Sequence, residues 1–407
     1  MSIFYLIFIG LALYFCFRYD GIEEYDQHKE HRLWLMCGYL ILLTGFSYGL
    51  GGDKFVYMED FEHYPSDLSD IGNNIWIQLM TNGQMPLWTL TNLILKYLFN
   101  SFYAVQLVQS AALNISLCYV MSKYTKRYFL FLLVYFFTLQ YFIFNTEIMR
   151  EGFAMAFILI GFHTWMNGKR WIYFVLLPIS IMFHISAIVS VLFPLVTLIK
   201  IKITWKSLAI AFFMAFSIWL LSDLLLGKVM MAVLGGMGAL VSKVLTYSIQ
   251  GSNIFGFIRA SMTYLILPFF IMYTSAMYEE SDDIRAKKEK LIAYMLVLGV
   301  LATSFVGFIR IYNYIQLFYL AMLADFIYIT FHNKTHLILR TGVLACTVFL
   351  LSLTYFKKYK TTNKFFYEFY YPYTCILDED KSVYIREITH IESTFVEEKD
   401  NNVRDIK

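Results

Sequence analysis

Apolar segments long enough to cross a membrane recur along most of the chain, and they constrain its fold more than any other feature. A spanning helix needs about 20 predominantly apolar residues. Such segments occupy 2–17, 33–50, 101–122, 127–145, 147–167, 171–183 with 185–199, 205–222, 257–278, 290–308, 311–331 and 336–355. Because helices satisfy their own backbone groups in lipid, the sequence predicts an all-α, polytopic helical membrane protein with about 11–13 membrane segments, some of them re-entrant or broken.

The composition supports a membrane protein and excludes several functional classes. Of 407 residues, 59% are hydrophobic and 15% are charged, whereas soluble domains average about 25% charged residues. The net charge of +3 comes from basic residues in short loops, which set topology, so we expect no nucleic-acid partner. No nucleotide-binding signature, Cys/His metal spacing or acidic cluster occurs in the apolar segments, so we expect no cofactor and no metal.

Loop charges predict how the chain is threaded. We expect residues 1–377 to form one integral membrane domain and 378–407 to form a polar, mobile tail. The acidic segment 51–85 and the glycine-broken segment 223–256 are predicted as outer loops, because the basic loops belong in the cytoplasm. This topology holds only if two conditions are met: 86–99, a short helix beginning at Pro86, does not cross, and 171–199 crosses twice with its turn near His184.

With this threading, five polar residues from separate parts of the chain converge near the outer face. They are Asp53, Arg150, His184, Arg259 and Arg310. The predicted orientation depends on loop lysines and arginines alone, so the convergence of these five residues is independent of it. Cations in apolar segments cost about 2.5–3.5 kcal/mol on insertion scales and usually face protein or a wet cavity. We therefore expect a buried anion, supplied from outside, beside these residues.

Arg150 is the strongest candidate for binding that anion. A guanidinium group matches two phosphate oxygens at once. The structural alternative is an arginine that satisfies carbonyl groups near a helix start, with Thr146 as the N-cap. Arg259 and Arg310 are weaker candidates of the same kind, and Asn313 and Tyr314 add polar groups beside Arg310.

His184 and Asp53 are rival candidates for a general base. His184 lies at a predicted helix break, and the pKa of a histidine suits proton transfer or hydrogen bonding to phosphate. The alternative is a core histidine satisfied by a neighbouring serine. Asp53 follows Gly51 and Gly52, which allow a close backbone approach to a ligand, and the aromatic residues Tyr57 and Phe61 follow it. The alternative there is a solvated turn aspartate.

Four stretches resemble the EpsG-like branch of the Wzy-type polysaccharide polymerases. They are YGLGGDKFVYMEDF, NTEIMREGFAMAFILIGFHTWMNGKRWIYFVLLPISIMFHISAIV, GFIRIYNYIQLF and the aromatic strip YEFYYPYTCIL. Their order and spacing match the family, although Glu151 stands after Arg150 where a glutamine is expected. The matching stretches extend over most of residues 1–377.

The resemblance implies a glycosyltransferase with a GT-C-like membrane core in the bacterial inner membrane. Such enzymes transfer an oligosaccharide from undecaprenyl pyrophosphate to a sugar hydroxyl at the periplasmic face, using a lipid-linked donor and acceptor and, as a further partner, a chain-length regulator. By this resemblance Arg150, Arg259 and Arg310 stabilise the pyrophosphate without a metal. His184 contacts the acceptor hydroxyl or the phosphate beside it, and Asp53 is the rival candidate for the base.

Other functions remain open from the sequence: a lipid-linked oligosaccharide ligase, a membrane O-acyltransferase and a flippase. A flippase needs cations along a cavity reachable from both faces, whereas these cations are predicted at the outer face. A membrane acyltransferase commonly places its histidine on the cytoplasmic side, whereas His184 is predicted outside.

Overall fold

The computed structural model describes residues 3–22, 26–51, 53–199, 202–224, 254–356, 366–371 and 373–376. Every named element in this part of the chain is a helix. The β pairing recorded there is a single isolated bridge between Ser47 and Cys375. The predicted all-α class is therefore confirmed. Most of the predicted outer loop 223–256 and the predicted tail 378–407 lie outside the described residues.

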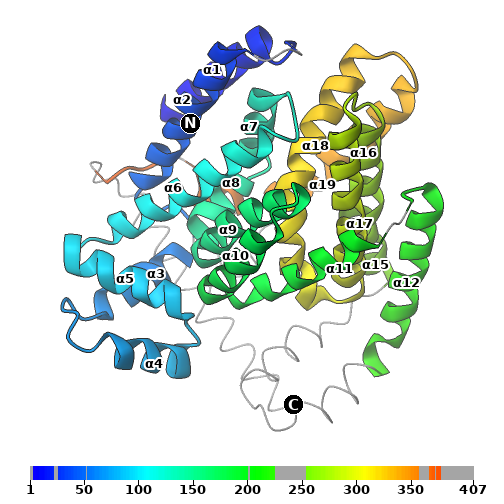
Figure 1. Ribbon diagram of the computed structural model, residues 1–407. Helices are drawn as coiled ribbons and strands as arrows, with labels where there is room; N and C mark the ends of the chain where they lie inside the picture. The colour runs from blue at the N-terminus through cyan, green and yellow to red at the C-terminus, as the bar shows by residue number, and fades with distance from the viewer. Residues whose placement is uncertain are drawn as a thin grey trace. The chain divides into compact units, whose positions relative to one another are not determined.

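The helices follow the apolar segments closely (Figure 1). The first part of the chain contains α1 (Ile3–Tyr19), α2 (Gln27–Gly45), α3 (Asp53–His63), α4 (Ile71–Asn82), α5 (Pro86–Phe99), α6 (Phe102–Met121), α7 (Tyr128–Phe137), α8 (Gln140–Phe142), η1 (Ile143–Glu147), α9 (Met149–Met166) and α10 (Arg170–Phe183). The later part contains η2 (Ile185–Val191), α11 (Leu192–Leu198), α12 (Trp205–Leu224), α15 (Ile254–Ser261), η4 (Met262–Ile266), α16 (Leu267–Met277), α17 (Asp282–Ser304), η5 (Val306–Tyr312), α18 (Asn313–His332), α19 (Leu337–Tyr355) and η6 (Phe366–Phe369).

Three of the described helices are long and apolar enough to cross a membrane: Phe102–Met121, Ile254–Met277 and Phe308–His332. A bent pair, Tyr128–Phe137 with Gln140–Glu147, makes a fourth if it counts as one span. Shorter apolar helices accompany them, among them α1, α10 and the main part of α19. By length and composition these helices support an integral membrane protein, while the predicted number of membrane segments stays a prediction.

The predicted membrane segment 127–145 is a bent pair of helices and not one continuous helix. The chain bends by 80° between α7 and α8, and the buried Leu139 takes a left-handed conformation at φ 61°. Tertiary hydrogen bonds stabilise the bend: the Tyr141 hydroxyl donates to the Leu40 carbonyl at 2.6 Å, and Asn114 Nδ2 donates to Asn145 Oδ1 at 3.1 Å. The chain then continues into the π-helix η1, which ends at Glu147.

Two predicted features around short helices are confirmed. Helix α5 begins at Pro86, whose missing N–H and fixed φ suit a first helical position. It ends at Phe99, and the next residue, Asn100, has a left-handed conformation. Helix α10 ends at Phe183 and η2 begins at Ile185, so the predicted break lies at His184. The segment 51–85, predicted as an outer loop, is largely helical, because it contains α3 and α4.

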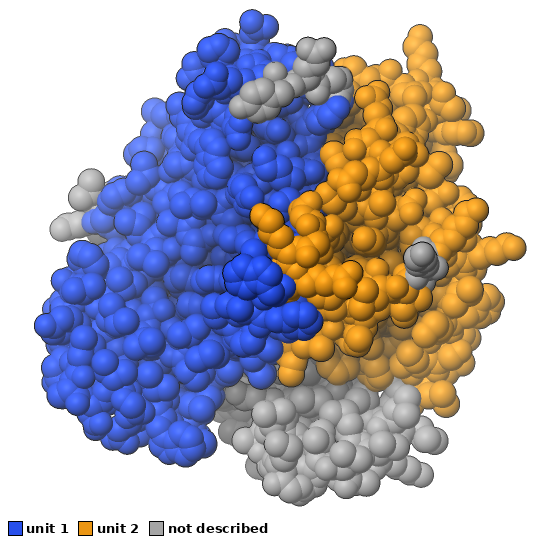
Figure 2. All heavy atoms as spheres, viewed as in Figure 1, with its two compact units in different colours: residues 1–164, 171–185, 348–407 blue, residues 165–170, 186–347 orange. Residues whose placement is uncertain are grey.

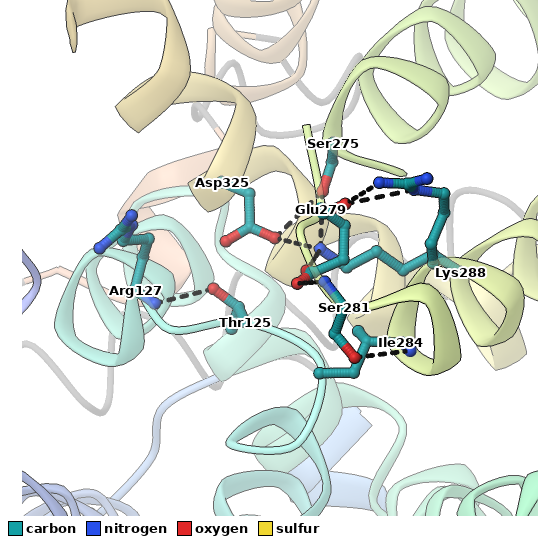
Figure 3. A network of polar contacts seen from close by, with 9 residues as sticks. Thr125, Arg127, Ser275, Glu279, Ser281, Ile284, Lys288 and Asp325 are labelled. Carbon is teal, nitrogen blue, oxygen red and sulfur yellow. Dashed lines mark hydrogen bonds and ion pairs between the residues drawn. The ribbon is translucent and has the colours of Figure 1, made fainter. Parts of the chain in front are cut away.

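The chain divides into two compact units, coloured blue and orange in Figure 2. The first comprises 1–164, 171–185 and 348–407, and the second 165–170 and 186–347. Inside the second, Lys288 is almost fully buried and pairs with Asp325 at 2.9 Å and with Glu279 at 2.8 Å (Figure 3). Ser275 donates to the same Asp325 oxygen at 3.0 Å. This network joins α16, α17 and α18. The buried Lys288 cation is stable there because its charge is paired with carboxylates.

Candidate functional site

The first unit places Arg150 against helix α3. Arg150 lies in the first turn of α9, and its guanidinium carbon is 5.5 Å from the centre of the Tyr57 ring. Its Nε is buried and has no hydrogen-bond partner. Among the described residues, no ion pair to Arg150 is recorded. A guanidinium group held on an aromatic ring without a carboxylate partner is suited to bind an anion.

Thr146 does not cap α9, contrary to the prediction. Its hydroxyl donates to the Phe142 carbonyl at 2.7 Å, four residues back. The reason is that Thr146 lies inside η1, where a threonine can bond to the preceding turn. Arg150 is therefore preceded by a π-helix, a feature often found at functional sites.

Glu147, the last residue of η1, connects the parts of this site. Its Oε2 accepts the Asp53 backbone N–H at 3.0 Å, and its Oε1 accepts the Tyr370 hydroxyl at 3.0 Å. Its backbone carbonyl accepts the Tyr57 hydroxyl at 3.1 Å. One residue beside Arg150 thus holds both the start of α3 and the C-terminal aromatic strip. Neither Glu147 nor Tyr370 is among the site residues predicted from the sequence.

The glycine loop 46–51 and the aromatic strip lie side by side. The Gly51 N–H donates to the Phe369 carbonyl at 3.0 Å, and the Tyr48 N–H donates to the Thr374 carbonyl at 2.9 Å. Gly51 has φ +83°, and a Cβ atom there would lie 2.7 Å from the Thr146 hydroxyl oxygen. A glycine is required at this position because other residues rarely adopt that φ and the space is filled.

His184 lies at the end of α10, on the side of the first unit where α9 begins. The Phe183 ring stacks on Phe153 at 4.8 Å, whereas near the other end of α10 the Tyr173 ring contacts Phe162 at 6.3 Å. The two helices are therefore antiparallel, and the end of α10 packs one turn from Arg150. The His184 N–H donates to the Ser180 carbonyl at 3.0 Å, and its side chain is half-buried.

The electrostatics of the cluster keep the Tyr57 hydroxyl protonated. Burial raises the pKa of Tyr57 to about 12, although the positive charge of Arg150 opposes this shift. The Tyr57 hydroxyl is therefore a hydrogen-bond donor at neutral pH. Asp53 is exposed in the first turn of α3, where the partial positive charge of the helix N-terminus stabilises a carboxylate.

The second unit contains the other two predicted arginines, both exposed. Arg259 lies in α15, and its charge acts on Tyr264. The Tyr264 ring contacts the Tyr312 ring at 5.2 Å, and Tyr312 follows Arg310 by two residues. One aromatic pair thus joins the segments of Arg259 and Arg310 within this unit.

The two polar residues predicted beside Arg310 differ in exposure. Tyr314 is fully buried, and its hydroxyl is 2.8 Å from the Ser186 hydroxyl. Asn313 is half-buried at the start of α18. Tyr314 therefore packs inside its unit, and Asn313 is the more accessible of the two. Within the described residues, no group of three or more His, Cys, Asp or Glu side chains is placed to hold a metal ion.

Comparison with known proteins gives one match. The model of the EpsG family matches residues 33–375, which include the glycine loop, the arginines, His184 and most of the aromatic strip. No curated protein and no solved structure matches the chain. Because the matched region covers most of the sequence, the chain belongs to the EpsG family.

Proposed function

We propose that this protein is a glycosyltransferase that polymerises oligosaccharide repeat units linked to undecaprenyl pyrophosphate. Membership of the EpsG family supports a polysaccharide-polymerase type of function, and the apolar helices support a membrane location. The proposed site faces the exterior of the bacterial inner membrane. The product is an O-antigen, capsular polysaccharide or exopolysaccharide.

The proposed reaction exchanges one carbon–oxygen bond for another. The bond between the anomeric carbon of the donor and its pyrophosphate breaks, and the electron pair stays on the pyrophosphate. A hydroxyl oxygen of the acceptor sugar bonds to that carbon, and the hydroxyl proton passes to a base. Negative charge grows on the leaving group, so fixed cations near it lower the barrier.

The observation that carries the proposal is the state of Arg150. Its Nε is buried without a partner, and its guanidinium group lies over Tyr57 with no ion pair recorded among the described residues. Leaving a buried polar group unsatisfied costs about 1–3 kcal/mol or more. A pyrophosphate oxygen at Nε would remove that cost. We assign Arg150 to the pyrophosphate, while Arg259 and Arg310 of the second unit remain candidates for phosphate binding that rest on the sequence.

His184 is our choice for the base that receives the acceptor proton, with Asp53 as its rival. Both residues belong to the first unit, as does Arg150. The Asp53 N–H bonds to Glu147, and His184 ends α10, which packs on α9. The half-buried position of His184 at a helix break suits proton transfer more than a packing role.

A flippase for the lipid-linked unit is the alternative outside the enzyme class, and genetics separates the two. Deleting the gene for a polymerase should leave single repeat units on the cell surface, because units are exported and then not joined. Deleting a flippase should leave none. A ligase or O-acyltransferase would leave polymer length unchanged. Surface saccharides of the deletion strain, separated by size, therefore test the proposal, and normal-length polymer or no surface units would contradict it.

A further inference from the structure

Helix α3 presents a stripe of polar and aromatic side chains that extends beyond the residues assigned so far. Residues 53, 57 and 60 recur at the spacing that keeps side chains on one helix face, and Tyr64 follows directly after the end of α3. Tyr57 in this stripe contacts Arg150. Asp60, one turn further along, has no role in the site as described above.

Asp60 is held by a buried amide. Gln84 is 3% exposed, and its Nε2 donates to Asp60 Oδ2 at 2.7 Å. The amide oxygen of Gln84 accepts a hydrogen bond from the Tyr64 hydroxyl. In the described part of the chain, Asp60 Oδ1 has no hydrogen-bond partner. One carboxylate oxygen is therefore fixed in orientation, and the other remains available to a ligand.

The charged groups around Asp60 leave it unpaired. Burial raises the pKa of Asp60, whereas the charge of Arg150 on α9 and the Gln84 hydrogen bond oppose this shift. On the same helix, the charge of Glu59 raises the pKa of Asp60 and the charge of His63 lowers it. Within the described residues, neither Arg150 nor His63 forms an ion pair with Asp60. A half-buried carboxylate in this state gains from a hydrogen-bond donor.

We propose that Asp60 binds a hydroxyl group of the saccharide beside Arg150, so that α3 holds the sugar while Arg150 holds the pyrophosphate. This proposal rests on the proposed function. A carboxylate accepts hydrogen bonds without donating any, which suits a sugar hydroxyl. Asp60 is assigned to binding, and the proton transfer stays with His184 or Asp53.

The test is the rate of polymer formation by the purified full-length protein at increasing concentrations of lipid-linked repeat unit. Losing a hydrogen bond to a charged group should raise KM about tenfold to a hundredfold in Asp60→Asn and change kcat much less. Asp60→Ser removes the charge with a smaller side chain and serves if the asparagine variant misfolds. Asp67→Asn is the matched control, because Asp67 is an exposed aspartate of the same segment.

The pH dependence separates binding from a structural role. Only the carboxylate form of Asp60 binds as proposed, so KM of the wild type should rise as pH falls through the pKa of Asp60, which lies above that of an ordinary aspartate. Asp60→Asn should lose this acidic limb. An unchanged KM in Asp60→Asn and Asp60→Ser, or an acidic limb that persists in them, would overturn the inference alone. An inactive wild type would overturn the proposed function and this inference with it.

Discussion

Removing the carboxylate of Glu147 should release the glycine loop and the aromatic strip from the helix that carries Arg150. Glu147→Ala deletes two hydrogen bonds to a charged group, from the Asp53 N–H and from the Tyr370 hydroxyl, both at 3.0 Å. Bonds of this kind contribute about 1.5–3 kcal/mol each. Because Glu147 is half-exposed, the lower figure applies, and the pair contributes about 3 kcal/mol. The local opening equilibrium should therefore shift by about a hundredfold.

Hydrogen exchange of the purified protein measures this shift directly, because local opening sets the exchange rate of protected amides. The amides of Tyr48 and Gly51, which donate to the strip, should exchange about a hundredfold faster in Glu147→Ala. Glu147→Gln keeps one carbonyl acceptor and should give an intermediate rate. Glu62→Ala, which removes an exposed glutamate of α3, is the matched control. Equal exchange in Glu147→Ala and the wild type would refute the anchoring role.

Three further predictions follow from particular contacts. Gly51→Ala should lower the melting temperature and polymer yield, because its Cβ would meet the Thr146 hydroxyl at 2.7 Å with φ at +83°; unchanged thermal melting would contradict this. Lys288→Met should destabilise the protein by about 3–5 kcal/mol, because two buried carboxylates lose their cation; a neutral result in denaturation would argue against the network. If His184 is the base, His184→Gln should be nearly inactive, because an amide cannot take the proton. A fully active His184→Gln enzyme, with Asp53→Asn inactive, would reverse the assignment.

The positions of most helices could be predicted from the sequence, because long apolar segments leave the backbone little choice in a membrane. Helix α6 covers nearly all of the predicted 101–122, and α19 nearly all of 336–355. Pro86 and the polar His184 also marked a helix start and a helix break correctly. These signals are local, so they can be recognised without knowing the tertiary structure.

The bend at Leu139 could not be predicted in this way. No glycine or proline marks it, and the hydrogen bonds that stabilise it come from Tyr141 to Leu40 and from Asn114 to Asn145, residues distant in the sequence. This bend leads into η1 and so positions Glu147 next to Asp53 and Tyr370. Glu147 was not predicted as a site residue because its partners are also distant in the sequence.

Lys54 is a charged residue whose burial the sequence does not show. It belongs to the acidic segment 51–85, yet it is fully buried, with Nζ donating to the Ser47 carbonyl at 2.9 Å and to its hydroxyl at 3.1 Å. The partners that pay for its burial become adjacent only when α3 folds against the glycine loop. Spacing alone does not show which charged residue in such a segment turns inward.

The central claim is that Arg150 stabilises the departing pyrophosphate, and polymer formation by purified variants tests it most directly. The assay supplies lipid-linked repeat units alone, without sugar nucleotide and with EDTA present. The wild type and Arg170→Ala, which removes an exposed arginine at the start of α10, should form polymer. Arg150→Ala should form none, and Arg150→Lys little, because a point charge cannot replace a two-pronged guanidinium. Wild-type polymer from well-folded Arg150→Ala, or a strict requirement for a divalent metal, would contradict the account.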